Sequence, residues 1–199
     1  MKSNKIRIAV FASGSGSNAE RFFEHFKHSP QAEIALVCSN RAEAYVLERA
    51  RNHQLPTYIF SNKQLQETKD VLIKLQEEKI DLIVLAGFLR LIPSYLIEAY
   101  PNRIVNIHPA LLPKWGGKGM WGIHVHEAVV NAKELQSGIT IHYVNGRYDE
   151  GDIIFQTSCA LTSADTPAEV AAKVLKLEHE HYPKVVEKLI NEQFTELKY

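Results

Sequence analysis

The stretch IRIAVFASGSGSNAE, residues 6–20, decides the fold. Residues 6–12 form a short apolar run with several β-branched side chains, which is typical of a buried strand. A glycine-containing turn follows, and residues 18–27 have the apolar spacing of a helix. A strand, a glycine turn and a helix in this order begin a βαβ unit, in which free N–H groups at the start of the helix can face an anion.

Strands and helices alternate through the rest of the first half. We expect strands at residues 34–38, 57–60, 82–86 and 103–108. We expect helices at residues 44–52, 63–78 and 93–100, with Pro93 at the first position of the last one. Alternation at this spacing predicts a mainly parallel sheet.

The second half has a different pattern. A long loop at 109–122 precedes a short helix near 127–132, and strands at 138–144 and 153–160 are expected to pair antiparallel at the sheet edge. Thr166 and Glu169 form a capping box with Pro167 between them, which predicts a long helix to about residue 189. The expected fold is α/β and Rossmann-like, a mainly parallel twisted sheet with an antiparallel edge and a long C-terminal helix.

The composition excludes several classes of protein. The chain has 199 residues, with 23 Lys and Arg against 23 Asp and Glu, and this zero net charge argues against a nucleic-acid binder with a basic face. Its two cysteines lie far apart, which suits a reducing compartment. Because Arg7 interrupts the first apolar run, we interpret it as a strand and not a signal peptide. No 18-residue apolar run is present, so we expect one cytoplasmic domain without a membrane span.

The turn GSGSNA, residues 14–19, is a candidate anion site. Ser15, Ser17 and Asn18 add side-chain donors to the backbone N–H groups. The turn also fits the dinucleotide fingerprint G-x-G-x-x-A, but no acidic residue ends the second strand. Arg41 stands there and can hold a 2′-phosphate, which leaves an NADP-binding reductase open beside a turn without any ligand. A phosphate monoester is the favoured ligand.

Asn106 and His108 lie on the same side of an expected strand, because side chains alternate along strands. They stand at its carboxyl end, where open α/β sheets bind ligands. An amide and an imidazole there can stabilise an oxyanion and move a proton. Asp149 near His108 is expected to raise the pKa of the imidazole and favour its cation. The alternatives are hydrogen bonds to loop backbone for Asn106 and His108, and turn chemistry for Asp149.

Glu178 interrupts an apolar stripe of the last expected helix. A carboxylate there is costly unless it is paired or binds a ligand, such as a sugar hydroxyl, and the alternative is an edge position that reaches water. A metal-binding site has less support, because the candidate ligands lack HExxH or CxxC spacing. These candidates are His108, His124, His126, His142 and Asp149.

Six segments in order carry a family resemblance: IAVFASGSGSN near the start, LAGFLRLI at 85–92, NIHPALLPK at 106–114, HVHEAV at 124–129, YDEGDII at 148–154 and LEHEHYP near the end. The chain resembles the phosphoribosylglycinamide formyltransferase family, folate-dependent enzymes of purine biosynthesis. The resemblance implies transfer of formyl from 10-formyltetrahydrofolate to the amine of phosphoribosylglycinamide. It also implies one formyltransferase domain over residues 1–199, with a phosphate-binding half at 1–100 and a catalytic and folate-contacting half at 101–199.

The resemblance assigns roles residue by residue. It implies a catalytic triplet of Asn106, His108 and Asp149, in which protonated His108 and the Asn106 amide stabilise the formyl oxygen. Substrate binding falls on Gly16, Ser17, Asn18, Pro109 and Glu178. Folate binding falls on Lys63, Leu89, Arg90, Leu91, Ile92, Asn106, Asn145 and Asp149. It implies no metal, small-molecule partners only, no nucleic acid or membrane, and a monomer or homodimer.

Several alternatives stay open beside this reading. Formyltetrahydrofolate deformylase shares the catalytic residues but normally has an additional regulatory domain, and methionyl-tRNA formyltransferase has an additional tRNA-binding domain. A ligand-binding module without turnover is a third alternative. The segment 115–122 is longer than in the best-known bacterial relatives, and we expect it to reshape the entrance to the site. Leu89 stands where some relatives have Met.

Overall fold

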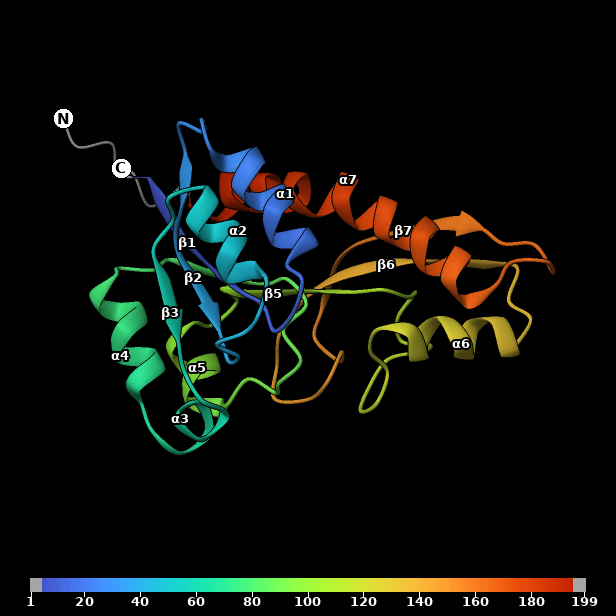
Figure 1. Cartoon of the computed structure of the whole chain (residues 1–199), viewed down its shortest axis with the longest axis horizontal. Coiled ribbons are helices and arrows are strands. Elements are labelled where there is room, and N and C mark those ends of the chain that lie inside the picture. The colour runs from blue at the N-terminus through green and yellow to red at the C-terminus, as the bar shows by residue number, and fades with distance from the viewer. Residues whose placement is uncertain (1–4, 195–199) are drawn as a thin grey trace.

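A mixed seven-stranded sheet forms the centre of the computed structural model, which describes residues 5–194. The strand order is β3-β2-β1-β4-β5-β6-β7, with β1 to β5 parallel and β6 and β7 antiparallel (Figure 1). The bounds are β1 Ile6–Phe11, β2 Ala32–Ser39, β3 Thr57–Ile59, β4 Leu82–Leu85, β5 Ile104–His108, β6 Gln136–Tyr143 and β7 Ile153–Ala160. The expected parallel sheet with an antiparallel edge is confirmed.

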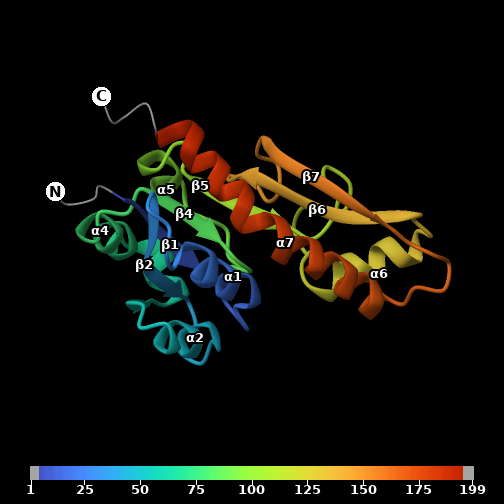
Figure 2. The same cartoon turned by 90° about the horizontal axis from the view of Figure 1, so that it is seen from above.

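Helices cover both faces of the sheet. Their bounds are α1 Ser17–Phe26, α2 Val46–Asn52, α3 Asn62–Glu67, α4 Asp70–Glu77, α5 Ser94–Ala99, α6 Ile123–Asn131 and α7 Pro167–Phe194. One core joins the sheet to α1, α2, α6 and α7, and the other joins it to α3, α4 and α5. Figure 2 shows the long helix α7 running across the sheet from the β6–β7 hairpin toward β4 and β5.

Strand β1 is apolar because both of its faces are covered. Ile8 and Val10 belong to the core with α1 and α7, and Ala9 and Phe11 belong to the core with α3 to α5. All four side chains are buried. A strand that is buried on both faces has a continuous apolar run instead of alternation, which is what residues 8–12 display.

The single helix expected at 63–78 is wrong, since the structure divides it into α3 and α4. Thr68 lies between them with extended φ and ψ of −126° and 173°. Its hydroxyl donates to the Gln64 carbonyl at 3.0 Å and accepts from the Asp70 N–H at 3.2 Å. A threonine side chain that competes for backbone groups interrupts a helix, and the apolar spacing of the segment does not reveal this break.

Other boundaries differ by a few residues. Pro93 has extended ψ of 153° and caps α5 instead of being its first residue, and α6 begins four residues before the expected start at 127. The long helix α7 continues to Phe194, past the expected end near 189. Its capping box is confirmed, because the Glu169 N–H donates to the Thr166 hydroxyl at 3.3 Å and the Glu169 carboxylate accepts from the Thr166 N–H at 2.8 Å.

Helix α7 is attached to the centre of the sheet through Tyr182. The hydroxyl of this buried residue lies 3.1 Å from the carbonyl oxygens of both Leu85 and Val105. The contact positions α7 beside the carboxyl ends of β4 and β5, where ligands bind in open α/β sheets. Within residues 5–194, no helix is long and apolar enough to cross a membrane.

Candidate active site

A cavity of about 860 Å³ lies at the carboxyl ends of β1, β4 and β5. Its volume is within the range of small-molecule sites. The lining comes from Asn18 of α1 and from residues within five further segments: 85–92, 106–109, 117–126, 142–149 and 171–178. All six contain residues that the sequence singled out as candidates.

The turn at the start of α1 has the backbone of an anion site. Gly16 caps the helix with φ of 71°, and no side chain caps the first turn. An added Cβ on Gly16 would lie 2.6 Å from Val46 Cβ, so a larger residue does not fit. The Arg49 guanidinium donates to the Ser15 carbonyl at 2.9 Å and holds the turn from outside. The N–H groups of the first turn are therefore available to an anion.

Asn18 and Glu178 meet at the cavity. The Asn18 amide donates to the Glu178 carboxylate at 2.7 Å, and Glu178 is 8% exposed. Burial raises the pKa of Glu178, while the Asn18 hydrogen bond acts against the rise. The structure therefore pairs this carboxylate instead of leaving it at a water-exposed edge. Gly16 and Ser17 are next to Asn18 in the chain, but only Asn18 of the three lines the cavity.

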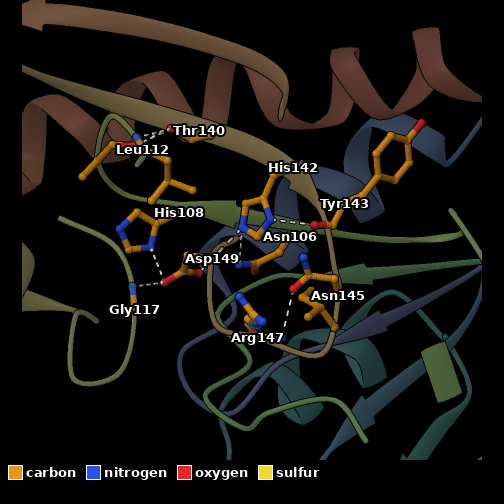
Figure 3. Close-up of polar contacts among 12 residues, drawn as sticks. Asn106, His108, Leu112, Gly117, Thr140, His142, Tyr143, Asn145, Arg147 and Asp149 are labelled. Atoms are coloured by element: carbon orange, nitrogen blue, oxygen red, sulfur yellow. Dashed lines mark hydrogen bonds and ion pairs between the residues drawn. The ribbon is translucent and has the colours of Figure 1, made fainter. Parts of the chain in front are cut away.

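The structure brings Asn106, His108 and Asp149 together. The first two project from β5, and Asp149 comes from the β6–β7 loop with a left-handed φ of 57°. His108 Nδ1 lies 3.4 Å from Asp149 Oδ2 (Figure 3). All three line the cavity. The proximity that the sequence analysis expected between Asp149 and His108 is present.

Segment 115–122 supplies backbone partners to two of these residues. The Trp115 carbonyl accepts from His108 Nε2 at 2.8 Å, and the Gly117 N–H donates to Asp149 Oδ2 at 3.0 Å. A Cβ on Gly116 would lie 3.3 Å from Asp149 Cβ and would overlap the Leu112 side chain. The segment was expected to reshape the entrance; it lines the cavity and also holds His108 and Asp149 directly.

The expected cation on His108 is wrong for the free site. His108 is 3% exposed, and burial lowers its pKa, although the Asp149 charge and the Trp115 carbonyl oppose this effect. Burial also works against ionisation of Asp149, but its polar contacts, among them the Gly117 N–H, hold the pKa of Asp149 below its ordinary value. The site at neutral pH therefore contains a neutral imidazole beside a carboxylate.

Two histidines complete the site, and sequence reasoning treated both only as possible metal ligands. His142 is 2% exposed and stands between Asn106 and Asp149. Its position follows from strand pairing, because His142 is directly opposite Asn106 in the β5–β6 register. Aligning the two strands would have found it. His126 of α6 is also buried and lines the cavity, and its Nδ1 has no hydrogen-bond partner among residues 5–194.

The segment 87–92 is hydrogen-bonded to Ser13, the residue before the turn at 14–19, which we call the anion turn. The buried Ser13 hydroxyl accepts from the Leu89 N–H at 3.1 Å, and the Ser13 N–H donates to the Gly87 carbonyl at 3.0 Å. Sequence reasoning missed Ser13, which carries no pattern signal of its own. Four predicted residues of this segment line the cavity: Leu89, Arg90, Leu91 and Ile92.

The remaining predicted residues divide into two groups. Pro109 and Asn145 line the cavity. Lys63 lies on α3 with its side chain 78% exposed and 3.9 Å from the Glu67 carboxylate, so the structure does not bring it to the cavity. Among residues 5–194 no cluster of three or more His, Cys, Asp or Glu is placed to hold a metal ion. The arrangement can bind an anion, donate an N–H to a developing oxyanion and move a proton.

Comparison with known proteins gives a consistent result. The sequence model of the family described as Formyl transferase matches residues 6–186. Phosphoribosylglycinamide formyltransferase of Bacillus subtilis is 35% identical over 92% of this chain and 94% of its own length. The chloroplastic enzyme of Arabidopsis thaliana is 38% identical over 94% of this chain, which spans 66% of the plant protein.

Solved structures agree with the sequence comparison. Phosphoribosylglycinamide formyltransferase from Anaplasma phagocytophilum superposes with a TM-score of 0.87 at 32% identity, covering 96% of this chain and 89% of that one. The Streptococcus pneumoniae enzyme has a TM-score of 0.81 at 38% identity, covering 92% and 98%. These findings confirm the resemblance that the six sequence segments carried.

Proposed function

Because the chain belongs to the formyl transferase family, we propose that it transfers the formyl group of 10-formyltetrahydrofolate to the amine of phosphoribosylglycinamide. The products are formylglycinamide ribonucleotide and tetrahydrofolate, formed in purine biosynthesis. One observation carries the proposal: Asn18 of the anion turn and all three members of the triplet line the same cavity. A phosphate-bearing substrate held at the turn can therefore extend to the reacting groups.

The phosphorylated substrate binds at the α1 end of the cavity. Gly16, Ser17 and Asn18 hold the phosphate through the uncapped first turn of the helix. Glu178 accepts hydroxyl groups of the ribose, and its burial beside Asn18 supports this role, because a buried carboxylate needs donors. Pro109, which follows His108 in the chain, also lines the cavity.

The folate co-substrate binds in another part of the cavity. The cavity there is bounded by segments 87–92 and 144–149. Apolar side chains of the first segment suit a flat ring, and Arg90 suits an anionic tail. The residues assigned to folate are Leu89, Arg90, Leu91, Ile92, Asn106, Asn145 and Asp149. Lys63 stays a prediction, with a role only for a tail that extends beyond the cavity.

The triplet performs the chemistry where the two substrates meet. The substrate amine attacks the formyl carbon, a new C–N bond forms, and negative charge develops on the formyl oxygen. The Asn106 amide donates an N–H to that oxygen. Both ring nitrogens of His108 already face Trp115 and Asp149, so the expected direct role of His108 at the oxygen is replaced by proton transfer.

One proton moves during the reaction. The amine loses it, and the folate nitrogen gains it as the old C–N bond breaks. His108 and Asp149 form a pair, with Nδ1 facing Asp149 Oδ2 and Nε2 facing the Trp115 carbonyl, and burial lowers the pKa of His108. The pair can accept the proton between Nδ1 and Oδ2 and pass it on through water. Holding both reactants in one cavity supplies a further large part of the acceleration.

The proposal includes the organisation of the chain. Residues 1–199 act as one formyltransferase domain, with phosphate binding in residues 1–100 and catalysis and folate contacts mainly in 101–199. Its partners are the two small molecules, its setting is cytoplasmic, and it acts as a monomer or homodimer.

An assay of folate product with and without phosphoribosylglycinamide tests the function. We expect tetrahydrofolate to form only when the acceptor amine is present. Formyl loss without acceptor would identify the alternative, a deformylase. A fluorescence titration with NADPH tests the reductase alternative, for which we expect no binding at micromolar cofactor. A protein that binds both substrates without turnover would be a binding module, and the proposal would then fail.

A further inference from the structure

His142 is a buried imidazole in the site that the mechanism above does not use. It projects from β6 between Asn106 and Asp149, as the labelled residues of Figure 3 show. Its Nε2 lies 3.1 Å from the Asn106 amide nitrogen and 3.7 Å from Asp149 Oδ1. Only 2% of the residue is exposed, so its ring nitrogens have protein partners instead of bulk water.

The partner of Nδ1 determines which tautomer His142 adopts. This nitrogen lies 2.8 Å from the carbonyl oxygen of Tyr143. A carbonyl only accepts hydrogen bonds, so Nδ1 carries a proton. In the neutral ring the other nitrogen, Nε2, then presents a lone pair. His142 is therefore a hydrogen-bond acceptor toward the Asn106 amide.

This lone pair selects the orientation of the Asn106 amide. An asparagine side chain can present either its NH₂ group or its oxygen to a neighbour, and the hydrogen-bond network decides between them. An acceptor at 3.1 Å requires the NH₂ group. One N–H is used by His142, and the second N–H remains for a ligand in the cavity that Asn106 lines. With the opposite orientation, the amide would present no donor there.

The backbone around His142 is built to hold the Tyr143 carbonyl in place. The β6–β7 register shifts between Ile141 and His142, and the Tyr143 N–H donates to the Asp152 carbonyl at 2.9 Å. Gly151 packs against the Tyr143 carbonyl so closely that a Cβ would overlap the oxygen. Glycine at this position therefore allows the carbonyl to face His142 Nδ1.

We propose that His142 is a positioning residue, which holds the Asn106 amide so that an N–H points to the formyl oxygen. The role of His142 in catalysis rests on the proposed function. The tautomer of His142 and the orientation of the Asn106 amide are features of the protein without substrates. His142 acts through Asn106 and does not touch the reacting atoms.

A double-mutant cycle tests the action through Asn106. His142→Leu removes the acceptor at similar volume, and we expect kcat to fall about tenfold, the effect of one hydrogen bond, with both KM values within about twofold. His142→Gln keeps an oxygen acceptor and should retain most of the wild-type kcat. In an Asn106→Ala background His142→Leu should have little further effect, because the group it positions is gone.

A second measurement does not depend on activity. Nitrogen-15 NMR of the histidine rings distinguishes the two neutral tautomers, and the signals missing in His142→Gln identify His142. We expect Nδ1 to carry the proton in the wild-type protein at neutral pH. If formyl transfer is absent but this tautomer is found, the proposed function fails while the geometry stands.

Three results would overturn the inference. The first is a loss of kcat in His142→Leu that is additive with the loss in Asn106→Ala. The second is an equal loss of kcat in His142→Leu and His142→Gln. The third is a proton on Nε2. Ser137→Ala is the matched control on the same strand, because its buried hydroxyl has no partner among residues 5–194 and lies away from the cavity. It should change neither kcat nor the His142 signals.

Discussion

Two parts of the cavity, the anion turn and the catalytic triplet, are built in different ways. The anion turn comes from one continuous segment, in which β1 leads through Gly16 directly into α1. The triplet comes from β5 and from a loop about 40 residues later, and the backbone of 115–122 holds two of its members. The turn follows from local backbone rules, while the triplet depends on packing between distant segments.

This difference separates binding from catalysis. A turn with free N–H groups is preformed wherever the strand, glycine and helix occur together, so it can bind an anion without help from remote residues. The triplet has its geometry and protonation only when the sheet, the β6–β7 loop and segment 115–122 are assembled. We therefore expect substitutions at the turn to change KM and substitutions at the triplet to change kcat.

The largest expected effect is at the triplet. His108→Ala and Asp149→Asn should each lower kcat by about 10²–10³, comparable to the loss of one catalytic group that acts in the transition state, with small changes in KM. Steady-state kinetics with both substrates measure this. His124→Ala is the control, because His124 is exposed and pairs with Glu127 outside the triplet. Near wild-type turnover of either triplet variant would show that the triplet does not control kcat.

A smaller effect is expected at the turn. Ser17→Ala combined with Asn18→Ala should raise KM for phosphoribosylglycinamide by about 10- to 100-fold, because hydrogen bonds to a charged group are lost. The KM for the folate should not change, which serves as the internal control. An unchanged KM for the phosphorylated substrate would place its phosphate elsewhere.

Two glycines of the β6–β7 loop sharpen the comparison further. Gly151→Ala should lower kcat by about tenfold, because its Cβ overlaps the Tyr143 carbonyl that orients His142. Gly146→Ala is the matched control, since an added Cβ meets nothing within 4 Å. Kinetics and thermal unfolding of both variants measure the difference. Equal behaviour of the two would show that catalysis does not need the exact position of this carbonyl.

The smallest expected effect concerns stability at the binding end. Burial raises the pKa of Glu178 in the folded protein above its unfolded value of 4.5. The free energy of unfolding therefore falls as pH rises from about 4.5 through the pKa of Glu178 in the folded protein, and the decrease is complete above that pKa. Glu178→Gln removes this titration and keeps an acceptor for the Asn18 amide. We expect its Tm at pH 8 to exceed that of wild type by about 2–4 °C, as for about 1 kcal/mol in a protein of this size.

The pH dependence of that difference is the test. Below pH 4.5 wild-type Glu178 is protonated in both states, so the advantage of the Gln variant should disappear. Calorimetry at pH 4 and pH 8 measures the two values. A Gln variant that is less stable than wild type at pH 8 would mean that ionised Glu178 contributes net stability through Asn18.

Much of the fold was predictable because its signals are local. Apolar runs identified the parallel strands, and the Thr166–Glu169 capping box identified the start of α7. The division of residues 63–78 was not predictable from apolar spacing, since the Thr68 hydroxyl interrupts the helix without changing that spacing. The position of His142 needed the β5–β6 register, which joins residues far apart in the chain.

The sequence by itself determined the strand–turn–helix of the anion site and placed Asn106 and His108 on one side of a strand. These features depend on glycine conformation and on alternation along a strand, which are properties of neighbouring residues. Only the tertiary structure decided that His108 is neutral and that His142 faces Asn106. Desolvation and hydrogen bonding depend on every segment packed around a group, and those segments come together only in the folded chain.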